Sequence, residues 1–468
     1  MTEVESIDKP ASMQSIITHV AIALALGIGI MMLPSPDNLP PAGQRLLGLL
    51  VTVVYLWVSE AVPIGATALL AAASMILLKI QPAQAAWAPF ASPAVMFVLM
   101  VIMFGVVLNE VGLANRLMFY LLKFAGTKIK RLSLILAIGC TMTSTVFHDA
   151  TITVIMVFAF VPVFISMGLK PGLGHKLPKF FMLLIPLSAS AGGFGTLLGG
   201  GRCPLAVEIL QKFSGGKISI GFLEFIVINF PLSILTAVLT WAIVWIFVRP
   251  EEKELAGVAL EDPGPMSRAE TGVFVIFIIT FTIWFMGDWT GWHYSVPAAF
   301  AILAFCGSGW VSFRTICDKF PWESWIVFGA GVSLGNTMLD SGAGRYLAEV
   351  FLPLLSGKPM FVVYYGMGFF GSFLSSMMAN SAAVALMLPI MLPMSEMMGL
   401  SPKVVTMIAP ISTSFIMLVI GCPPTIIAYS TGYFTQTEFI KIAVIWAMIL
   451  LLGCVLGMLA YWPMIGFI

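Results

Sequence analysis

Charged residues are scarce in this sequence. Only 10% of its 468 residues are Asp, Glu, Lys or Arg, and 59% are hydrophobic, whereas about a quarter of an ordinary soluble protein is charged. The mean hydropathy of +1.02 argues against a soluble globular domain. The composition instead predicts a polytopic protein of the plasma (inner) membrane, with the lipid bilayer as its surroundings.

Several chemical signatures are also absent. The net charge is only +1 and no long basic run occurs, which argues against nucleic acid as a partner. The six cysteines show no CxxC spacing, so we predict neither disulfides nor a zinc site. Neither a His-Glu-x-x-His nor a Gly-x-Ser-x-Gly motif is present, which disfavours an intramembrane enzyme. The sequence implies no cofactor.

What the chain does have is apolar runs long enough to span about 30 Å of hydrocarbon. The first run lacks a cleavage pattern of small residues, so we predict a retained helix and not a signal peptide. The runs lie near 15–33, 45–63, 64–79, 93–110, 219–248, 270–287, 296–311, 325–340 and 438–463.

Two further segments, 132–168 and 360–398, are each about twice as long as a span. Polar residues interrupt both near the middle, at Asp149 in the first and at Asn380 in the second, with an offset of 231 residues. Because an unpaired polar group in hydrocarbon costs several kcal/mol, these residues must face protein, water or a ligand. We predict two re-entrant helical hairpins whose tips stop inside the membrane.

Two other apolar segments, 180–210 and 403–430, are broken by glycines and prolines at 199–204 and 421–424. Such residues cannot continue a helix, so these segments are predicted to be discontinuous helices. Each half of the chain thus supplies a span, a hairpin and a broken helix. An odd number of crossings separates corresponding elements, which predicts inverted repeats, a pattern typical of secondary transporters. The predicted fold is an all-α membrane protein with about 11 transmembrane helices.

Loop charges give an orientation. The positive-inside rule places three basic segments on the cytoplasmic side, and the first hairpin enters and leaves the membrane on that side. Eleven crossings then put the N-terminus in the cytoplasm and the C-terminus outside. The basic residues are Lys123, Lys128, Lys130 and Arg131, then Lys170, Lys176 and Lys179, and finally Arg249, Lys253 and Arg268.

The chain divides into six segments on this interpretation. They are an N-terminal segment with the first helix (1–43), scaffold and connecting helices of the first repeat (44–131), its transport-domain hairpin and broken helix (132–212), scaffold helices and the start of the second repeat (213–341), the second connecting helix, hairpin and broken helix (342–432), and a last transmembrane helix (433–468).

Three motifs together carry a family resemblance. They are Trp57-Val58-Ser59-Glu60-Ala61-Val62-Pro63, the Asn380-Ser381 pair and Gly421-Cys422-Pro423-Pro424-Thr425. In this order they resemble the divalent anion/sodium symporter family over about residues 45–465. The resemblance implies a homodimer, a scaffold domain, a transport domain that moves like an elevator, and di- or tricarboxylates or sulfate as substrates.

The resemblance also implies site residues. The substrate positions are His148, Asp149, Thr151, Arg202, Cys203, Asn380, Ser381, Cys422, Pro423 and Thr425, and the cation positions are Ser144, Asp149, Gly199, Ser375, Asn380 and Gly421. This chain departs from the family at the inner tip, where His148-Asp149-Ala150 replaces a Ser-Asn-Thr triplet. It departs again in the first broken helix, where Arg202-Cys203-Pro204 replaces a Pro-Pro loop.

Several roles stay open at this level. Asn380 and Ser381 are helix caps, substrate contacts at a helix N-terminus, or both. Asp149 is costly at membrane depth and needs a partner: either it bridges to Arg202, or it binds the coupling cation or a proton with help from His148. Glu60, Glu110 and Asp340 are assigned interfacial or structural roles. We expect sodium at the outer half-site, which retains Asn380 and Gly421.

The sequence therefore predicts a secondary active transporter of a small anion, a di- or tricarboxylate, sulfate, or related sulfonate or carboxylate. Arg202 is the best candidate to bind the anion, because its planar fork matches a carboxylate or sulfate. Coupling is expected to Na⁺, H⁺ or both. The alternatives are an anion exchanger without cation coupling and a sodium/proton antiporter.

Overall fold

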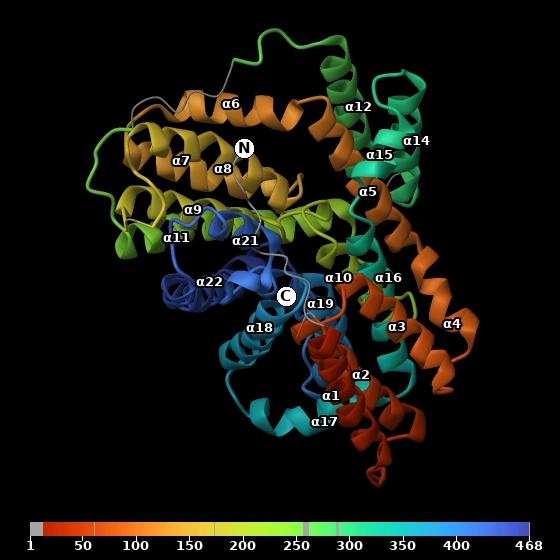
Figure 1. The fold of residues 1–468 in the computed structure, drawn as a ribbon. Coiled ribbons are helices and arrows are strands. Elements are labelled where there is room, and N and C mark those ends of the chain that lie inside the picture. The colour runs from red at the N-terminus through yellow and green to blue at the C-terminus, as the bar shows by residue number, and fades with distance from the viewer. Residues whose placement is uncertain (1–12, 60, 173, 256–261, 287–289, 468) are drawn as a thin grey trace.

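The computed structural model describes residues 13–59, 61–172, 174–255, 262–286 and 290–467. Throughout these residues the regular structure is helical, and the predicted all-α fold is confirmed (Figure 1). Eight of the described helices are long and apolar enough to cross a membrane, and two shorter apolar helices accompany them. Glu60 lies outside the described residues.

Every apolar run expected to span the membrane forms a helix. These are α1 (Met13–Met32), α2 (Pro41–Ser59), α3 (Ile64–Leu77), α5 (Pro93–Glu110), α11 (Phe222–Phe247), α12 (Arg268–Phe285), α14 (Ser295–Gly307), α16 (Trp322–Asp340) and α22 (Gln436–Met464). Short pieces lie between them: α4 (Ala83–Trp87), the 3₁₀ turn η1 (Ala88–Ala91) and α15 (Phe313–Lys319).

Both hairpins and both broken helices are present. The first hairpin pairs α7 (Ile129–Ser144) with α8 (Asp149–Ser166), and the second pairs α18 (Met360–Met377) with α19 (Asn380–Met397). The first broken helix is α9 (Lys176–Gly192) and α10 (Arg202–Phe213). The second is α20 (Pro402–Ser412), the 3₁₀ turn η2 (Val419–Gly421) and α21 (Pro423–Tyr429).

The connecting helices α6 (Leu113–Ala125) and α17 (Ala343–Leu355) show the repeat relation most directly. Each follows a glycine in the left-handed region, Gly112 at φ +86° and Gly342 at φ +75°. A residue with a Cβ is strained there, which explains why glycine stands at both positions, 230 residues apart. The two repeats thus contain the same elements in the same order: α5 to α11 and α16 to α22.

Two ion pairs link the repeats crosswise. Lys179, in the first turn of α9, bonds to Glu438 in the first turn of α22. Lys403, in the first turn of α20, bonds to Glu224 in the first turn of α11 at 2.6 Å. Each broken helix is therefore joined to the last helix of the other repeat, and each glutamate also accepts a hydrogen bond from the backbone N–H of the N-cap residue of its own helix.

The position of α11 differs from the division made from the sequence. That division grouped 213–341 as scaffold, but α11 packs mainly against α7, α9 and α22 and makes only a small contact with α12. The elements around the two broken helices thus include α11 and α22.

The three basic segments meet at one place. The chain around Lys128 pairs with the segment at Glu254 through an isolated β-bridge, and Lys176 bonds to Glu251 at 2.7 Å. That bond lowers the pKa of Glu251. A cavity of about 710 Å³ there is lined by Lys128, Lys130, Lys176, Arg249 and Lys253, among others. This proximity agrees with a single membrane side for all three segments.

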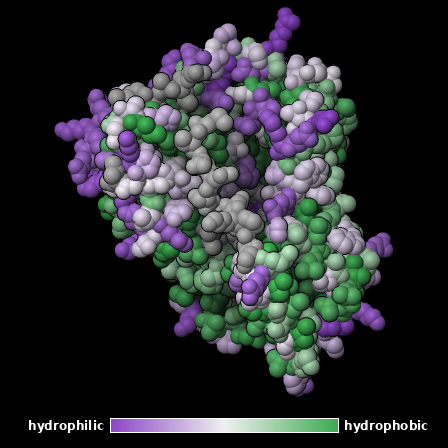
Figure 2. All heavy atoms as spheres, in the orientation of Figure 1, coloured by the Kyte–Doolittle hydropathy of each residue, from purple (hydrophilic) through white to green (hydrophobic). Residues whose placement is uncertain are grey.

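In Figure 2, hydrophilic side chains gather at the left edge of the face and apolar ones cover its lower right.

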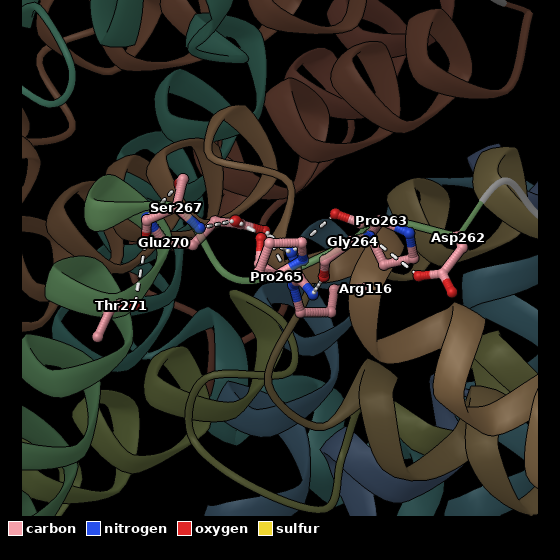
Figure 3. A network of polar contacts seen from close by, with 8 residues as sticks. All are labelled: Arg116, Asp262, Pro263, Gly264, Pro265, Ser267, Glu270 and Thr271. Carbon is pink, nitrogen blue, oxygen red and sulfur yellow. Dashed lines mark hydrogen bonds and ion pairs between the residues drawn. The ribbon is translucent and has the colours of Figure 1, made fainter.

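The connecting helix α6 is fixed to the start of α12. Arg116, 5% exposed, donates two hydrogen bonds to the carboxylate of Glu270, at 2.9 and 3.1 Å, and a third to the carbonyl of Gly264 at 2.7 Å (Figure 3). A bidentate Arg–carboxylate pair has a defined geometry. This network therefore holds one end of the first repeat against the helices outside the hairpins.

Candidate functional site

The two hairpin tips and the two helix breaks converge on one cavity of about 530 Å³. The first repeat contributes the tip at 146–151 and the loop at 197–202, and the second contributes 379–381 and 421–423. Of the predicted site residues, those lining the cavity are His148, Asp149, Thr151, Gly199, Arg202, Asn380, Ser381, Gly421, Cys422 and Pro423. The structure thus brings these distant segments together around one cavity.

At the inner tip, a histidine and an aspartate begin α8. His148 is the N-cap residue, and its Nδ1 accepts a hydrogen bond from the Ala150 N–H at 3.3 Å. Asp149 Oδ1 accepts from the same N–H at 2.8 Å and lies 3.3 Å from His148 Nδ1. The imidazole is half exposed, whereas the carboxylate is buried. A carboxylate at a helix N-terminus is favourably placed relative to the helix dipole.

At the outer tip, Asn380 begins α19 and bonds across the hairpin. Its Oδ1 accepts from the Ser375 hydroxyl at 2.6 Å. The N-cap residue is Ala379, which makes no side-chain capping bond. The N-cap position, for which Asn380 and Ser381 were considered, is therefore occupied by a residue without a polar side chain.

The residues behind the tips repeat the same bonds in both halves. Ser144 donates to the carbonyl of Ala189 at 2.6 Å, and Ser375 donates to the carbonyl of Thr413 at 2.7 Å. One turn earlier in each hairpin, Thr141 donates to Ser188 at 2.9 Å and Ser372 donates to Ser412 at 2.8 Å. Each hairpin is thus tied to the end of its own broken helix by two matched bonds.

The loops bring backbone carbonyls close to glycines. A methyl group on Gly199 would lie 2.9 Å from the carbonyl oxygen of Ser144, and one on Gly421 would lie 3.3 Å from that of Ser375. Unwound backbone with free carbonyl oxygens is the usual sodium-binding arrangement in transporters with broken helices. Among the described residues no cluster of three His, Cys, Asp or Glu side chains could hold a metal ion.

Arg202 turns back into its own loop. The residue is 3% exposed, and its Nη2 donates to the carbonyl of Ser190 at 3.4 Å. The ion pairs within 4 Å in the described part of the chain include none between Arg202 and Asp149. The bridge between these residues considered from the sequence is therefore not formed in this structure.

Four predicted residues lie behind the cavity wall. Ser144 and Ser375 make the matched bonds described above, and Cys203 donates to the carbonyl of Gly193 at 3.4 Å. Thr425 is fully buried and donates to the carbonyls of Val419 and Cys422, at 2.5 and 2.8 Å. These side chains shape the loops that face the cavity.

The opposite wall was not among the predicted site residues. It consists largely of apolar side chains from α5 and α16, namely Val98, Val101, Ile102, Val327 and Phe328. Glu110 also lines the cavity and pairs with Lys319 at 2.5 Å, and Glu323 accepts from the Gly65 N–H at 2.8 Å. In the sequence, Glu110 and Glu323 could be noticed as acidic residues at the ends of apolar runs. The apolar residues of this wall could not be noticed, because nothing in the sequence distinguishes them from residues that face lipid.

Comparisons with known proteins identify relatives along most of the chain. The family model described as the sodium:sulfate symporter transmembrane region matches residues 14–468. The chain is 24% identical over 444 residues to the sodium-dependent dicarboxylate transporter SdcS of Staphylococcus saprophyticus, covering 86% of this chain and 83% of the relative. It is 25% identical over 429 residues to an uncharacterized transporter of Haemophilus influenzae, covering 86% and 88%.

A solved structure shares the fold. The crystal structure of the YdaH transporter of Alcanivorax borkumensis superposes with a TM-score of 0.56 at 15% identity, covering 96% of this chain and 98% of that one. With the family model matching nearly the whole chain, and with its paired hairpins and broken helices around one cavity, the protein belongs to the sodium:sulfate symporter family of divalent anion/sodium symporters.

Proposed function

We propose that this protein is a cation-coupled transporter that carries a small anion across the membrane by an elevator movement, with sodium as a coupling ion. Its family consists of secondary anion transporters and not of enzymes. The observation that carries the proposal is the convergence of two helix N-termini and two carbonyl-rich breaks on one cavity of about 530 Å³.

The helix N-termini and the breaks suit ions of opposite charge. At α19 the N-cap residue makes no side-chain bond, so the N-terminal turn beside the cavity favours an anion. At α8 the carboxylate of Asp149 already accepts from the Ala150 N–H. The first arms of the hairpins place the carbonyl oxygens of Ser144 and Ser375 beside Gly199 and Gly421 of the breaks, which favours a small hard cation. The site accordingly suits a compact carboxylate, sulfate or sulfonate group whose charge is balanced by a co-transported cation.

An elevator movement is supported by the contrast between the two cavity walls. The hairpins and breaks supply most of the polar lining, whereas α5 and α16 present mainly apolar side chains. An apolar wall makes few hydrogen bonds or ion pairs, so few such bonds must break when a neighbouring unit slides past it. We propose that α7 to α11 and α18 to α22 form the moving unit, and that α1 to α5 and α12 to α16 form the static scaffold.

The arrangement in the membrane completes the proposal. The meeting of the three basic segments supports a cytoplasmic location for all of them, with the N-terminus inside and the C-terminus outside. A homodimer through the static scaffold is proposed on the family resemblance.

The decisive experiment is uptake by the purified full chain in proteoliposomes. Succinate, citrate, sulfate, a sulfonate and a monocarboxylate are supplied in turn under an imposed sodium gradient, a proton gradient, both or neither. We expect at least one anion to accumulate with the sodium gradient. Transport that needs neither gradient but is stimulated by internal anion identifies an exchanger, and sodium-for-proton exchange without anion movement identifies an antiporter.

A further inference from the structure

The loop of the first broken helix already contains a positive charge. We infer that the guanidinium of Arg202 is a built-in cation of the first repeat, so that only the second repeat takes up a coupling cation. This inference rests on the proposed function, because it sets how many cations accompany each anion.

The first step is the equivalence of the two loops. Gly199 lies against the carbonyl of Ser144 as Gly421 lies against that of Ser375, and the two serines make matched bonds to Ala189 and Thr413. In both repeats a carbonyl oxygen of the hairpin's first arm therefore lies beside a loop glycine, behind the hairpin tip. Carbonyl oxygens gathered in this way need a positive charge or a set of N–H donors.

The second step is the place of the arginine. A methyl group on Gly193 would lie 2.2 Å from Arg202 Nη2 and 3.1 Å from the carbonyl oxygen of Gly199. The guanidinium thus occupies the space next to the carbonyls of the first loop, where Nη2 also donates to Ser190. Gly193 has no Cβ in the way, so the close approach of the charged group depends on this glycine.

The third step is the contrast with the second repeat. The residue aligned with Arg202, at an offset of 220, is Cys422. Its thiol lies 3.6 Å from the Thr425 hydroxyl and 3.7 Å from the Ser190 hydroxyl. A thiol supplies no fixed positive charge, so the Ser375 carbonyl beside Gly421 is left for an external cation.

Electrostatics explains why the first loop then excludes sodium. A second positive charge within a few ångströms of a buried guanidinium is repelled, and burial weakens the screening of that repulsion. The buried Nε of Arg202 has no hydrogen-bond partner in the described structure. Asp149 lines the same cavity as Arg202 but forms no direct ion pair with it among the described residues.

The test compares wild type with two variants that exchange the charge between repeats. Arg202→Met removes the fixed charge from the first loop, and Cys422→Arg places one at the equivalent position of the second. Sodium activation of anion uptake and the ratio of ²²Na⁺ to labelled anion are measured in proteoliposomes, with the substrate that the uptake panel identifies. Thermal unfolding in detergent checks that each variant is folded.

We expect a Hill coefficient for sodium of about one in the wild type, since the coefficient is bounded by the number of sites. Arg202→Met should raise this coefficient toward about two, and a higher sodium concentration should be needed for half-maximal uptake. Cys422→Arg should abolish sodium stimulation. A wild-type ratio of two or more sodium ions per anion contradicts the inference without any variant. So does an Arg202→Met protein with unchanged sodium dependence and weakened anion affinity, which would assign Arg202 to the substrate.

A direct binding measurement separates this inference from the proposed function. Equilibrium binding of ²²Na⁺ to the purified protein, with choline as the control salt, counts cation sites even when none of the tested anions is transported. One site in the wild type and a second in Arg202→Met support the built-in cation. Two sites in both proteins overturn it, whatever the substrate is.

Discussion

At the residue scale, the two hairpin tips differ chiefly in charge. Asn380 accepts a hydrogen bond from Ser375 across its hairpin, whereas Asp149 carries a carboxylate and bonds within its own first turn. Ser144, the counterpart of Ser375, donates to the Ala189 carbonyl. The inner tip thus has a carboxylate whose side-chain bonds, among the described residues, stay within the tip.

Neutralising this charge should reveal its role in coupling. Asp149→Asn keeps the shape of the side chain and removes the carboxylate. If the residue carries a proton, wild-type uptake accelerates at acidic pH and the variant loses that pH dependence. If it helps to bind sodium, the variant needs more sodium and keeps its pH dependence. Uptake measured across pH at several fixed sodium concentrations distinguishes the two outcomes, and Asp37→Asn is the control, because it removes an exposed carboxylate that does not line the cavity.

At the outer tip, Asn380→Ala and Ser381→Ala should reduce uptake more strongly than they reduce the amount of folded protein. Both residues line the cavity, and neither is the N-cap of α19. Loss of one hydrogen bond to a charged substrate corresponds to about 1.5–3 kcal/mol, which is at least a tenfold loss of apparent affinity. Equal losses of folded protein and of transport would instead indicate a structural role.

At the element scale, the packing of α9 against α7 limits side-chain size. A methyl group on Gly192 would lie 2.1 Å from the carbonyl oxygen of Thr141, and backbone cannot move aside as a flexible side chain can. Gly192→Ala should therefore destabilise the protein by about 1–3 kcal/mol, seen as a lower unfolding temperature in detergent. Gly29→Ala on α1 meets nothing within 4 Å and should leave that temperature unchanged or slightly raised.

The elements were more predictable than their contacts. Long apolar runs, glycine-proline breaks and a polar residue in mid-run are local signals, so the hairpins around Asp149 and Asn380 could be inferred from composition and spacing. The inward turn of Arg202 could not, because it depends on the absence of a Cβ at Gly193, nine residues earlier. The grouping of α11 with the broken helices was also hidden, since one apolar helix face resembles another in sequence.

At the scale of the whole molecule, the proposed division into moving and static units predicts which cross-links arrest transport. Lys212 on α10 pairs with Asp340 on α16 at 3.2 Å, so this contact crosses between the units. Lys212→Cys with Asp340→Cys, joined by a short bifunctional thiol reagent, should stop uptake. The background carries Cys306→Ser and Cys317→Ser, because these two native thiols are partly exposed.

The matched control joins two elements of the moving unit. Lys179→Cys with Glu438→Cys links α9 to α22, which already form an ion pair. This cross-link should leave uptake largely intact, because both ends travel together. Arrest by both cross-links, or by neither, would contradict the proposed division.

The crosswise ion pairs have a consequence for biosynthesis. Lys179 meets Glu438, a residue made 259 positions later, whereas Lys403 meets a glutamate made 179 positions earlier. The ion pair of the first broken helix can therefore form only after the final helix has been synthesised and inserted. The second repeat finds its partner already inserted. Although the halves are alike in architecture, their order of assembly is unequal, and a nascent chain stopped before residue 436 would hold a lysine at α9 without its acid.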